Sequence, residues 1–143
     1  MLYRNKKVND MNEGKWLGLG GKIESGESPD DCVIREVREE SGLELTAVHA
    51  RGLVHFIDDS GYAEDMYLYT AEVSTDATVD EDLFELQTCD EGELCWIDKD
   101  KIFELNLWEG DRVFLKLLAE DAPFFELELI YNGDKLVNSR LLA

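Results

Sequence analysis

The chain has 143 residues and carries 33 acidic against 14 basic side chains, which gives a formal net charge of −19 at pH 7. A protein this acidic repels phosphate backbones and anionic lipid headgroups, so duplex nucleic acid and an anionic membrane surface are excluded as expected partners. A small anionic ligand would need a bound cation to offset the same repulsion.

The composition and the absence of repeats predict one domain, residues 1–143, in the cytoplasm. The three cysteines, Cys32, Cys89 and Cys95, have neither metal-type nor disulfide-framework spacing, which is typical of reduced thiols in the cytoplasm. No apolar run approaches the ~20 residues that cross a bilayer, and the charged N-terminus lacks a signal-peptide core. We therefore expect no membrane association.

The first part of the chain predicts a short strand, a glycine-rich loop and one helix. Leu2–Arg4 is strand-like, and a polar stretch leads to the pair Gly20-Gly21. Ser28 is an N-cap candidate, Pro29 follows at the first helical position, and Gly42 is placed to end the helix. Start and stop signals therefore agree on a helix between Ser28 and Gly42.

The rest of the chain alternates irregularly between strand-like and helical patterns. Strands are expected at Leu45–Ile57, Met66–Val73 and Glu93–Ile97. Apolar residues at helical spacing predict a second helix over Glu109–Ala119, and Asn132-Gly133 between two alternating runs predicts a hairpin. This order favours an α+β fold, with a mixed sheet and helices against it.

The first helix carries an unusual set of acids. At about 100° per residue, Glu36, Glu39 and Glu40 fall within an arc of roughly 100° beside an apolar stripe. One interpretation is an ordinary solvated face, which costs only a few tenths of a kcal/mol for each like-charged pair. The other is a site for Mg²⁺ or Mn²⁺, which prefer oxygen ligands. The second is favoured because these acids lie toward the helix C-terminus, where the macrodipole disfavours negative charge.

The spacing of residues 21–43 carries a resemblance to a known family. These residues read G-x5-E-x7-R-E-V-x-E-E-x-G-L, which resembles the Nudix box at every fixed position. The resemblance implies the Nudix fold, an α/β/α sandwich with a mixed sheet. It also implies hydrolysis of a nucleoside diphosphate linked to another group, with a divalent metal as cofactor and a small nucleotide as the substrate.

The same resemblance assigns roles to residues of the box. Glu36 and Glu40 would be direct metal ligands, with the Gly20 carbonyl as a third. Glu39 would complete the metal cluster or take the proton from the attacking water.

Other roles concern residues that orient ligands or bind phosphate. Arg35 and Glu27 would orient the ligating carboxylates. Lys22, directly after the glycines, would act as a point charge for a substrate phosphate, and Arg4 is a further candidate. For Arg4, the alternative is ordinary surface charge.

Three segments outside or at the edge of the box carry a finer resemblance: Trp16 ahead of Gly20-Gly21-Lys22, Asp90-Glu91 before Cys95-Trp96, and Trp108-Glu109-Gly110-Asp111. Their layout resembles the MutT-like branch that acts on oxidised purine nucleoside triphosphates. By that resemblance Glu91 would reach the metal, Trp108 would stack on a purine base, and Asp111 would hydrogen-bond to it. Trp108 could instead be core, and Asp111 a helix N-terminal acid. Leu17 occupies a position where a relative in this branch has an asparagine that reads the base, which puts oxidised-guanine selectivity in doubt.

Two other functions remain open from the sequence. One is hydrolysis of ADP-ribose, a dinucleoside polyphosphate or a capped RNA end, and the other is a non-catalytic nucleotide sensor. The family usually has another strand before the one expected at Leu2–Arg4. Its absence would leave a sheet edge open for pairing with a second copy, as a homodimer.

Overall fold

The computed structural model describes residues 1–5, 10–73 and 92–143. The chain forms two compact units, one of Met1–Val48 with Ala71–Asn106 and the other of His49–Thr70 with Leu107–Ala143. The assignment of the whole chain to one domain stays a prediction. Within the described residues, no helix has the length and apolar character needed to cross a membrane.

The first unit contains a three-stranded sheet with β1 in the middle. β1 (Leu2–Arg4) pairs antiparallel with both β2 (Trp16–Leu17) and β5 (Gly92–Leu94). Leu2 is 1% exposed and lies opposite a leucine on each neighbouring strand. The strand predicted at Leu2–Arg4 is therefore confirmed.

The strand predicted at Glu93–Ile97 is correct only in part. β5 ends at Leu94, which pairs with the first residue of β1, Leu2; beyond it Cys95 still bonds to Met1, its N–H donating to the Met1 carbonyl at 2.9 Å. The chain then turns into a 3-10 helix, η1 (Lys99–Glu104), where the Asp98 side chain accepts a hydrogen bond from the Asp100 N–H at 3.0 Å. The prediction is wrong for residues 95–97.

The predicted first helix is confirmed as α1 (Pro29–Ser41). Ser28 Oγ accepts a hydrogen bond from the Asp31 N–H at 3.1 Å, which satisfies one of the donors that a helix start leaves unpaired. Gly42 ends the helix with φ of +75°, and its N–H donates to the Arg38 carbonyl at 2.8 Å. A left-handed residue at this position is readily supplied by glycine.

A four-stranded mixed sheet belongs mainly to the second unit, in the order β4-β3-β6-β7. β3 (Leu45–Asp58) is parallel to β6 (Phe125–Asn132), which is antiparallel to β7 (Lys135–Leu141). β4 (Ala63–Val73) forms the other edge. The strands predicted at Leu45–Ile57 and Met66–Val73 are confirmed, one residue and three residues longer.

The C-terminal hairpin is confirmed, but its turn lies one residue later than the prediction. Asn132 is the last residue of β6 and pairs with Lys135, so the two turn residues are Gly133 and Asp134. Gly133 has φ of +61°. Glycine at the first central position is typical of a type II′ turn, which matches the twist of the flanking strands.

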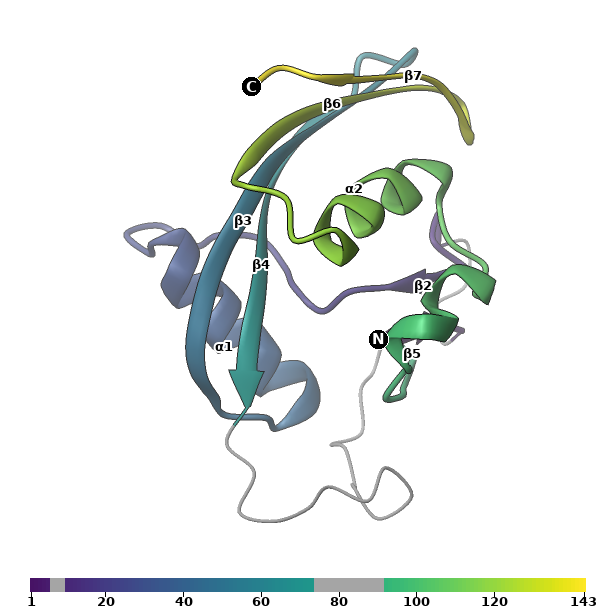
Figure 1. Cartoon of the computed structure of the whole chain (residues 1–143). Helices are drawn as coiled ribbons and strands as arrows, with labels where there is room; N and C mark the ends of the chain where they lie inside the picture. Colours follow the sequence, from purple (N-terminus) through teal and green to yellow (C-terminus); the bar gives the residue numbers. More distant parts are fainter. Residues whose placement is uncertain (6–9, 74–91) are drawn as a thin grey trace. The chain divides into compact units, whose positions relative to one another are not determined.

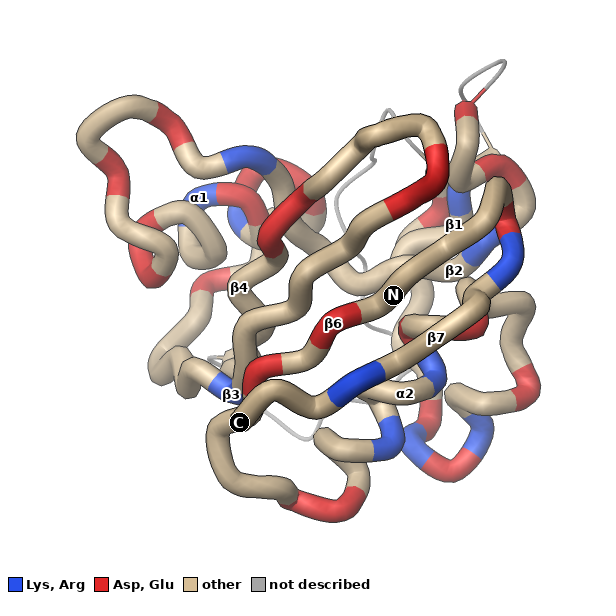
Figure 2. Tube along the Cα trace, turned by 90° about the horizontal axis from the view of Figure 1, so that it is seen from above, with Lys and Arg blue, Asp and Glu red and all other residues tan. Residues whose placement is uncertain are grey.

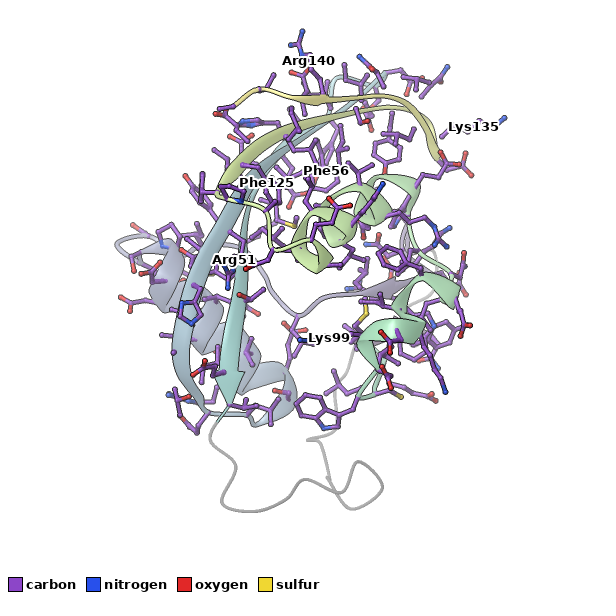
Figure 3. All side chains as sticks on the ribbon, in the orientation of Figure 1. Arg51, Phe56, Lys99, Phe125, Lys135 and Arg140 are labelled. Atoms are coloured by element: carbon purple, nitrogen blue, oxygen red, sulfur yellow. The ribbon has the colours of Figure 1, made fainter. Side chains whose placement is uncertain are left out.

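The core of the second unit lies between this sheet and α2 (Glu109–Ala119), whose predicted bounds are confirmed. Every second residue of β6 is buried, and these residues pack with Val54 and Phe114. α2 lies under the curved sheet in Figure 1, and the labelled rings of Phe56 and Phe125 belong to the same core in Figure 3. The α+β class with a mixed sheet is thus confirmed.

The opposite face of the same sheet is charged. Figure 2 looks onto β4, β3, β6 and β7 and shows acidic positions of β6 next to a basic position of β7. There Arg140 Nη2 lies 3.3 Å from Glu128 Oε1, and Figure 3 shows Arg140 pointing away from α2. The alternation of β6 therefore separates an apolar side from a solvated one.

Candidate functional site

One arginine of α1 holds two of the helix's three acids, Glu36 and Glu39, together with Glu27 ahead of the helix. Arg35 Nη1 donates to Glu36 Oε1 at 2.9 Å and to Glu39 Oε2 at 3.1 Å. Its Nε and Nη2 donate to the two carboxylate oxygens of Glu27 at 2.7 and 3.0 Å. A guanidinium has donors in a planar fork, so it can bind one carboxylate with two bonds and still reach others. This network offsets the repulsion among the acids of the helix.

The network changes how readily its members ionise. The hydrogen bonds from Arg35, followed by one from the backbone N–H of Glu24, lower the pKa of Glu27 to about 2. The same bond to Glu27 is the main reason that the pKa of Arg35 is raised. Both groups are therefore charged at neutral pH, so the two-bond pair between Arg35 and Glu27 is maintained there.

The glycine loop brings bare backbone against this acidic face. A Cβ atom added to Gly21 would lie 2.4 Å from the Glu36 carboxyl carbon, so no larger residue fits there without displacing Glu36. The Gly20 N–H donates to Glu40 Oε1 at 3.0 Å. Arg35 Nη2 also donates to the Lys22 carbonyl at 3.2 Å, which ties the loop to the helix.

Cys32 supports the same junction between the glycine loop and α1. Its buried Sγ lies 3.8 Å from the Gly21 carbonyl and 3.8 Å from Arg35 Nη2. Burial, with the neighbouring Glu27 carboxylate, raises the pKa of the thiol. Cys32 is thus a neutral packing residue between the loop and the helix.

The oxygen donors of this face fit a hard divalent cation. Glu36, Glu39 and Glu40 supply carboxylates beside the Gly20-Gly21 backbone, and Mg²⁺ prefers such oxygens. Over residues 1–5, 10–73 and 92–143, no three acidic, histidine or cysteine side chains already form a ligand cluster. Mg²⁺ is usually held by one or two carboxylates, with waters and substrate phosphates completing the shell, so a full protein cluster is not required. Glu91, the further expected ligand, lies outside the described residues.

The predicted phosphate-binding residues differ in their surroundings. Lys22 is exposed on the glycine loop. Arg4 is only 14% exposed, and its Nε donates to Asp10 Oδ2 at 2.8 Å. Leu17 lies on β2 opposite Leu2 and is half-buried. Of the two cations, Lys22 is the more accessible to an anion.

The predicted base-recognition residues belong to the second unit. Trp108 directly precedes α2 and is packed against the core, and Asp111 lies in the first turn, 9% exposed. The Trp108 ring meets the Tyr131 ring edge-on, with centroids 5.8 Å apart and an interplanar angle of 89°. The Tyr131 hydroxyl also accepts a hydrogen bond from the Gly110 N–H at 2.8 Å. Sequence analysis did not identify Tyr131, because nothing local links it to a segment 21 residues earlier.

Comparison with known proteins shows which family the chain is similar to. A model of the NUDIX domain matches residues 1–118. The uncharacterized Nudix hydrolase YvcI of Bacillus subtilis is 36% identical over 133 residues, which are 90% of this chain and 80% of that protein. The oxidized purine nucleoside triphosphate hydrolase of Danio rerio is 28% identical over 137 residues, 94% of this chain and 82% of that protein.

A solved structure agrees with the sequence comparisons. The crystal structure of a MutT mutator protein from Bacillus halodurans matches with a TM-score of 0.77 and 27% identity. The match covers 90% of this chain and 82% of that one. The fold expected from residues 21–43 is confirmed.

Proposed function

The chain belongs to the Nudix hydrolase family, and on this basis we propose that it hydrolyses a purine nucleoside triphosphate to the monophosphate and pyrophosphate, with Mg²⁺. The observation that carries the proposal is the Arg35 network, which holds Glu36 and Glu39 on the face that meets Gly20-Gly21. The substrate class, oxidised purines included, is supported by the name of the Danio rerio relative.

The metal-binding part of the proposal rests on the carboxylates of α1. Glu36 and Glu40, with the Gly20 carbonyl, would hold the ion, and Glu39 would take the proton from the attacking water. A divalent ion bound there would offset the negative charge of the phosphates and polarise the phosphorus. Arg35 and Glu27 would fix the directions of the carboxylates, which is the role that such outer residues commonly have. Mn²⁺ would fit the same oxygens.

The substrate-binding part rests on Lys22, Trp108 and Asp111. Lys22 would bind a substrate phosphate, because its exposed ammonium stands beside the glycine loop. Trp108 would stack on the base, and Asp111 would accept hydrogen bonds from it. Leu17 offers no side-chain hydrogen bond, so selectivity for an oxidised purine would depend on Asp111.

Product analysis tests the reaction. The protein is incubated with Mg²⁺ at mildly alkaline pH, with or without EDTA, and the substrates are oxidised and normal deoxynucleoside triphosphates, ADP-ribose and a dinucleoside tetraphosphate. We expect Mg²⁺-dependent release of monophosphate and pyrophosphate, fastest from a purine triphosphate. Faster cleavage of ADP-ribose or of the tetraphosphate would contradict the proposed substrate class but not the proposed metal site. No turnover of any of them would contradict the proposal.

A variant tests the base-recognition residue separately. Asp111→Asn should change the ratio of kcat/KM between an oxidised and a normal purine triphosphate, because the amide can donate where the carboxylate only accepts. Asp134→Asn, in the exposed hairpin turn, is the matched control and should keep the ratio. An unchanged ratio in Asp111→Asn would remove this residue from the proposal.

A further inference from the structure

α2 begins without the usual side-chain cap. Trp108 occupies the N-cap position with an extended backbone, and its side chain makes no capping hydrogen bond. The first N–H groups of a helix have no partner within the helix, and a Ser, Thr, Asp or Asn side chain normally accepts from the second or third. Here the third, that of Asp111, reaches the Trp108 carbonyl at 3.1 Å. The second, that of Gly110, needs an acceptor from elsewhere.

That acceptor is the phenol of Tyr131 on β6. The Gly110 N–H donates to Tyr131 Oη at 2.8 Å, and both residues are buried. The tyrosine thus replaces the missing cap from a strand that follows the helix in the chain. An unpaired N–H at this depth would be costly, so the bond holds the first turn against the sheet.

The contact requires glycine at position 110. A Cβ atom added there would lie 2.4 Å from Tyr131 Oη and 2.7 Å from Leu129 Cδ1. Neither distance is compatible with a side chain, and both neighbours are buried in the core. Gly110 stands between Trp108 and Asp111, so the close approach is made within the segment proposed to bind the base.

Tyr131 also contacts Trp108 directly. The two rings meet edge-on, 5.8 Å between centroids, an arrangement that aromatic quadrupoles favour. One side chain therefore limits both the rotation of the Trp108 ring and the direction of the backbone that leads to Asp111. Burial raises the pKa of Tyr131 to about 12, so the phenol stays neutral over the working range.

We propose that Tyr131 is a positioning residue for base selectivity, acting through its hydroxyl on Gly110 and through its ring on Trp108. This inference rests on the proposed function, since it assigns a purine base to the Trp108–Asp111 segment. Tyr131 itself does not touch the substrate in this proposal. Its effect is to keep the stacking ring and the carboxylate in one arrangement.

The kinetic test uses Tyr131→Phe, which keeps the ring and removes the hydroxyl. We expect KM for the best purine triphosphate to rise about tenfold with kcat within about twofold, because the lost bond loosens base binding and not the phosphate chemistry. KM for dCTP should change less, so the purine preference falls. Tyr67→Phe, on β4 and 49% exposed, is the matched control and should keep both values.

A second variant checks that the hydroxyl acts on Gly110. Gly110→Ala should reduce the purine preference in the wild-type background and reduce it less when combined with Tyr131→Phe, since the collision with Oη is then removed. Independent of activity, amide hydrogen exchange at Gly110 should be about tenfold faster in Tyr131→Phe. A merely structural role would lower the melting temperature without changing the ratio between substrates.

The outcomes separate the two proposals. A wild-type protein that does not prefer a purine triphosphate over dCTP contradicts the proposed function. A wild-type protein with that preference, together with a Tyr131→Phe variant that retains the ratio, overturns the positioning role alone. Unchanged exchange at Gly110 in that variant also overturns it.

Discussion

The acidic face of α1 and the first turn of α2 are stabilised by different physical means. On α1, one arginine with a fixed fork of donors binds three carboxylates that are partly open to water. At the start of α2, one buried phenol receives one backbone N–H, and apolar side chains surround the pair. The carboxylates of the first arrangement can exchange Arg35 for a bound cation. The hydrogen bond of the second arrangement only fixes the backbone at the start of α2.

The difference matches the two tasks proposed for these regions. A metal site needs charges that can be rearranged when phosphate and cation arrive, and half-exposed carboxylates allow that. A base site needs rigid groups at set positions, and burial with full hydrogen bonding supplies rigidity. Four predictions test this comparison, from the largest expected effect to the smallest.

Removing one charge from the acidic face should have the largest effect. Glu40→Gln keeps the shape of the side chain but loses a negative ligand, and kcat should fall about 10³-fold, or about 4 kcal/mol in the activation barrier. Steady-state hydrolysis with Mg²⁺ measures the loss. Glu44→Gln, whose exposed carboxylate pairs with Arg38, is the control and should retain activity. Comparable activity in the two variants would contradict the metal assignment.

A cavity in the core of the second unit should affect stability more than any exposed residue there. Leu129 is fully buried, so Leu129→Ala should lower the free energy of unfolding by about 2–5 kcal/mol. Urea unfolding followed by circular dichroism measures it. Val137→Ala, at 58% exposure on β7, should change the same quantity by less than about 0.5 kcal/mol. Equal losses would mean that apolar packing is not what holds this unit.

Replacing the arginine fork should disturb catalysis while sparing the fold. Arg35→Lys retains one positive charge but cannot bind Glu27 with two bonds and still reach Glu36, so kcat should fall about 10- to 100-fold. Arg38→Lys, on the same helix with an exposed partner, serves as the control. A melting temperature lowered as much as for Leu129→Ala would show that the network is structural instead.

The smallest expected effect concerns pH and a histidine of the second unit. His55 Nδ1 lies 2.5 Å from Asp65 Oδ1 and Nε2 lies 2.7 Å from Glu126 Oε1, and these carboxylates raise the pKa of His55, Asp65 contributing most. Because the folded-state pKa is the higher one, the stabilisation is complete below the ordinary value of about 6.5 and is lost as pH rises through the raised value.

Urea unfolding from pH 5.5 to 9 measures this effect. The destabilisation caused by His55→Gln should be about 1 kcal/mol or less at the acid end and should shrink as pH rises. His49→Gln, at the other histidine of the sequence, which is exposed, is the matched control for the loss of an imidazole. A constant difference across the pH range would mean that the two carboxylates do not act on a protonated ring.

The sequence predicted the region around α1 well because its signals are local. Ser28, Pro29 and Gly42 act on the helix within one turn of themselves, and the acids repeat with the helical period. The close approach of Gly21 to Glu36 comes from the structure. The roles of the metal ligands and of Trp108 and Asp111 stay predictions.

Two smaller errors concern the ends of strands, and both have non-local causes. The hairpin was found from Asn132-Gly133, but the turn lies one residue later, since strand pairing continues through Asn132. The strand expected to reach Ile97 ends at Leu94, because the length of β5 is set by its pairing with β1. Strand ends depend on the neighbouring strand, which is absent from any local window of sequence.

The sequence alone determined the Nudix box, the positions of α1 and α2, and the alternation of apolar residues that buries one face of β6. Only the tertiary structure decided that β6 lies parallel to β3, that Arg35 binds Glu27 with two bonds, and that Tyr131 caps the helix that begins at Glu109. The physical reason is that helix signals and strand alternation follow from backbone geometry over a few residues. A hydrogen bond between residues 21 positions apart depends instead on which faces the completed core brings together.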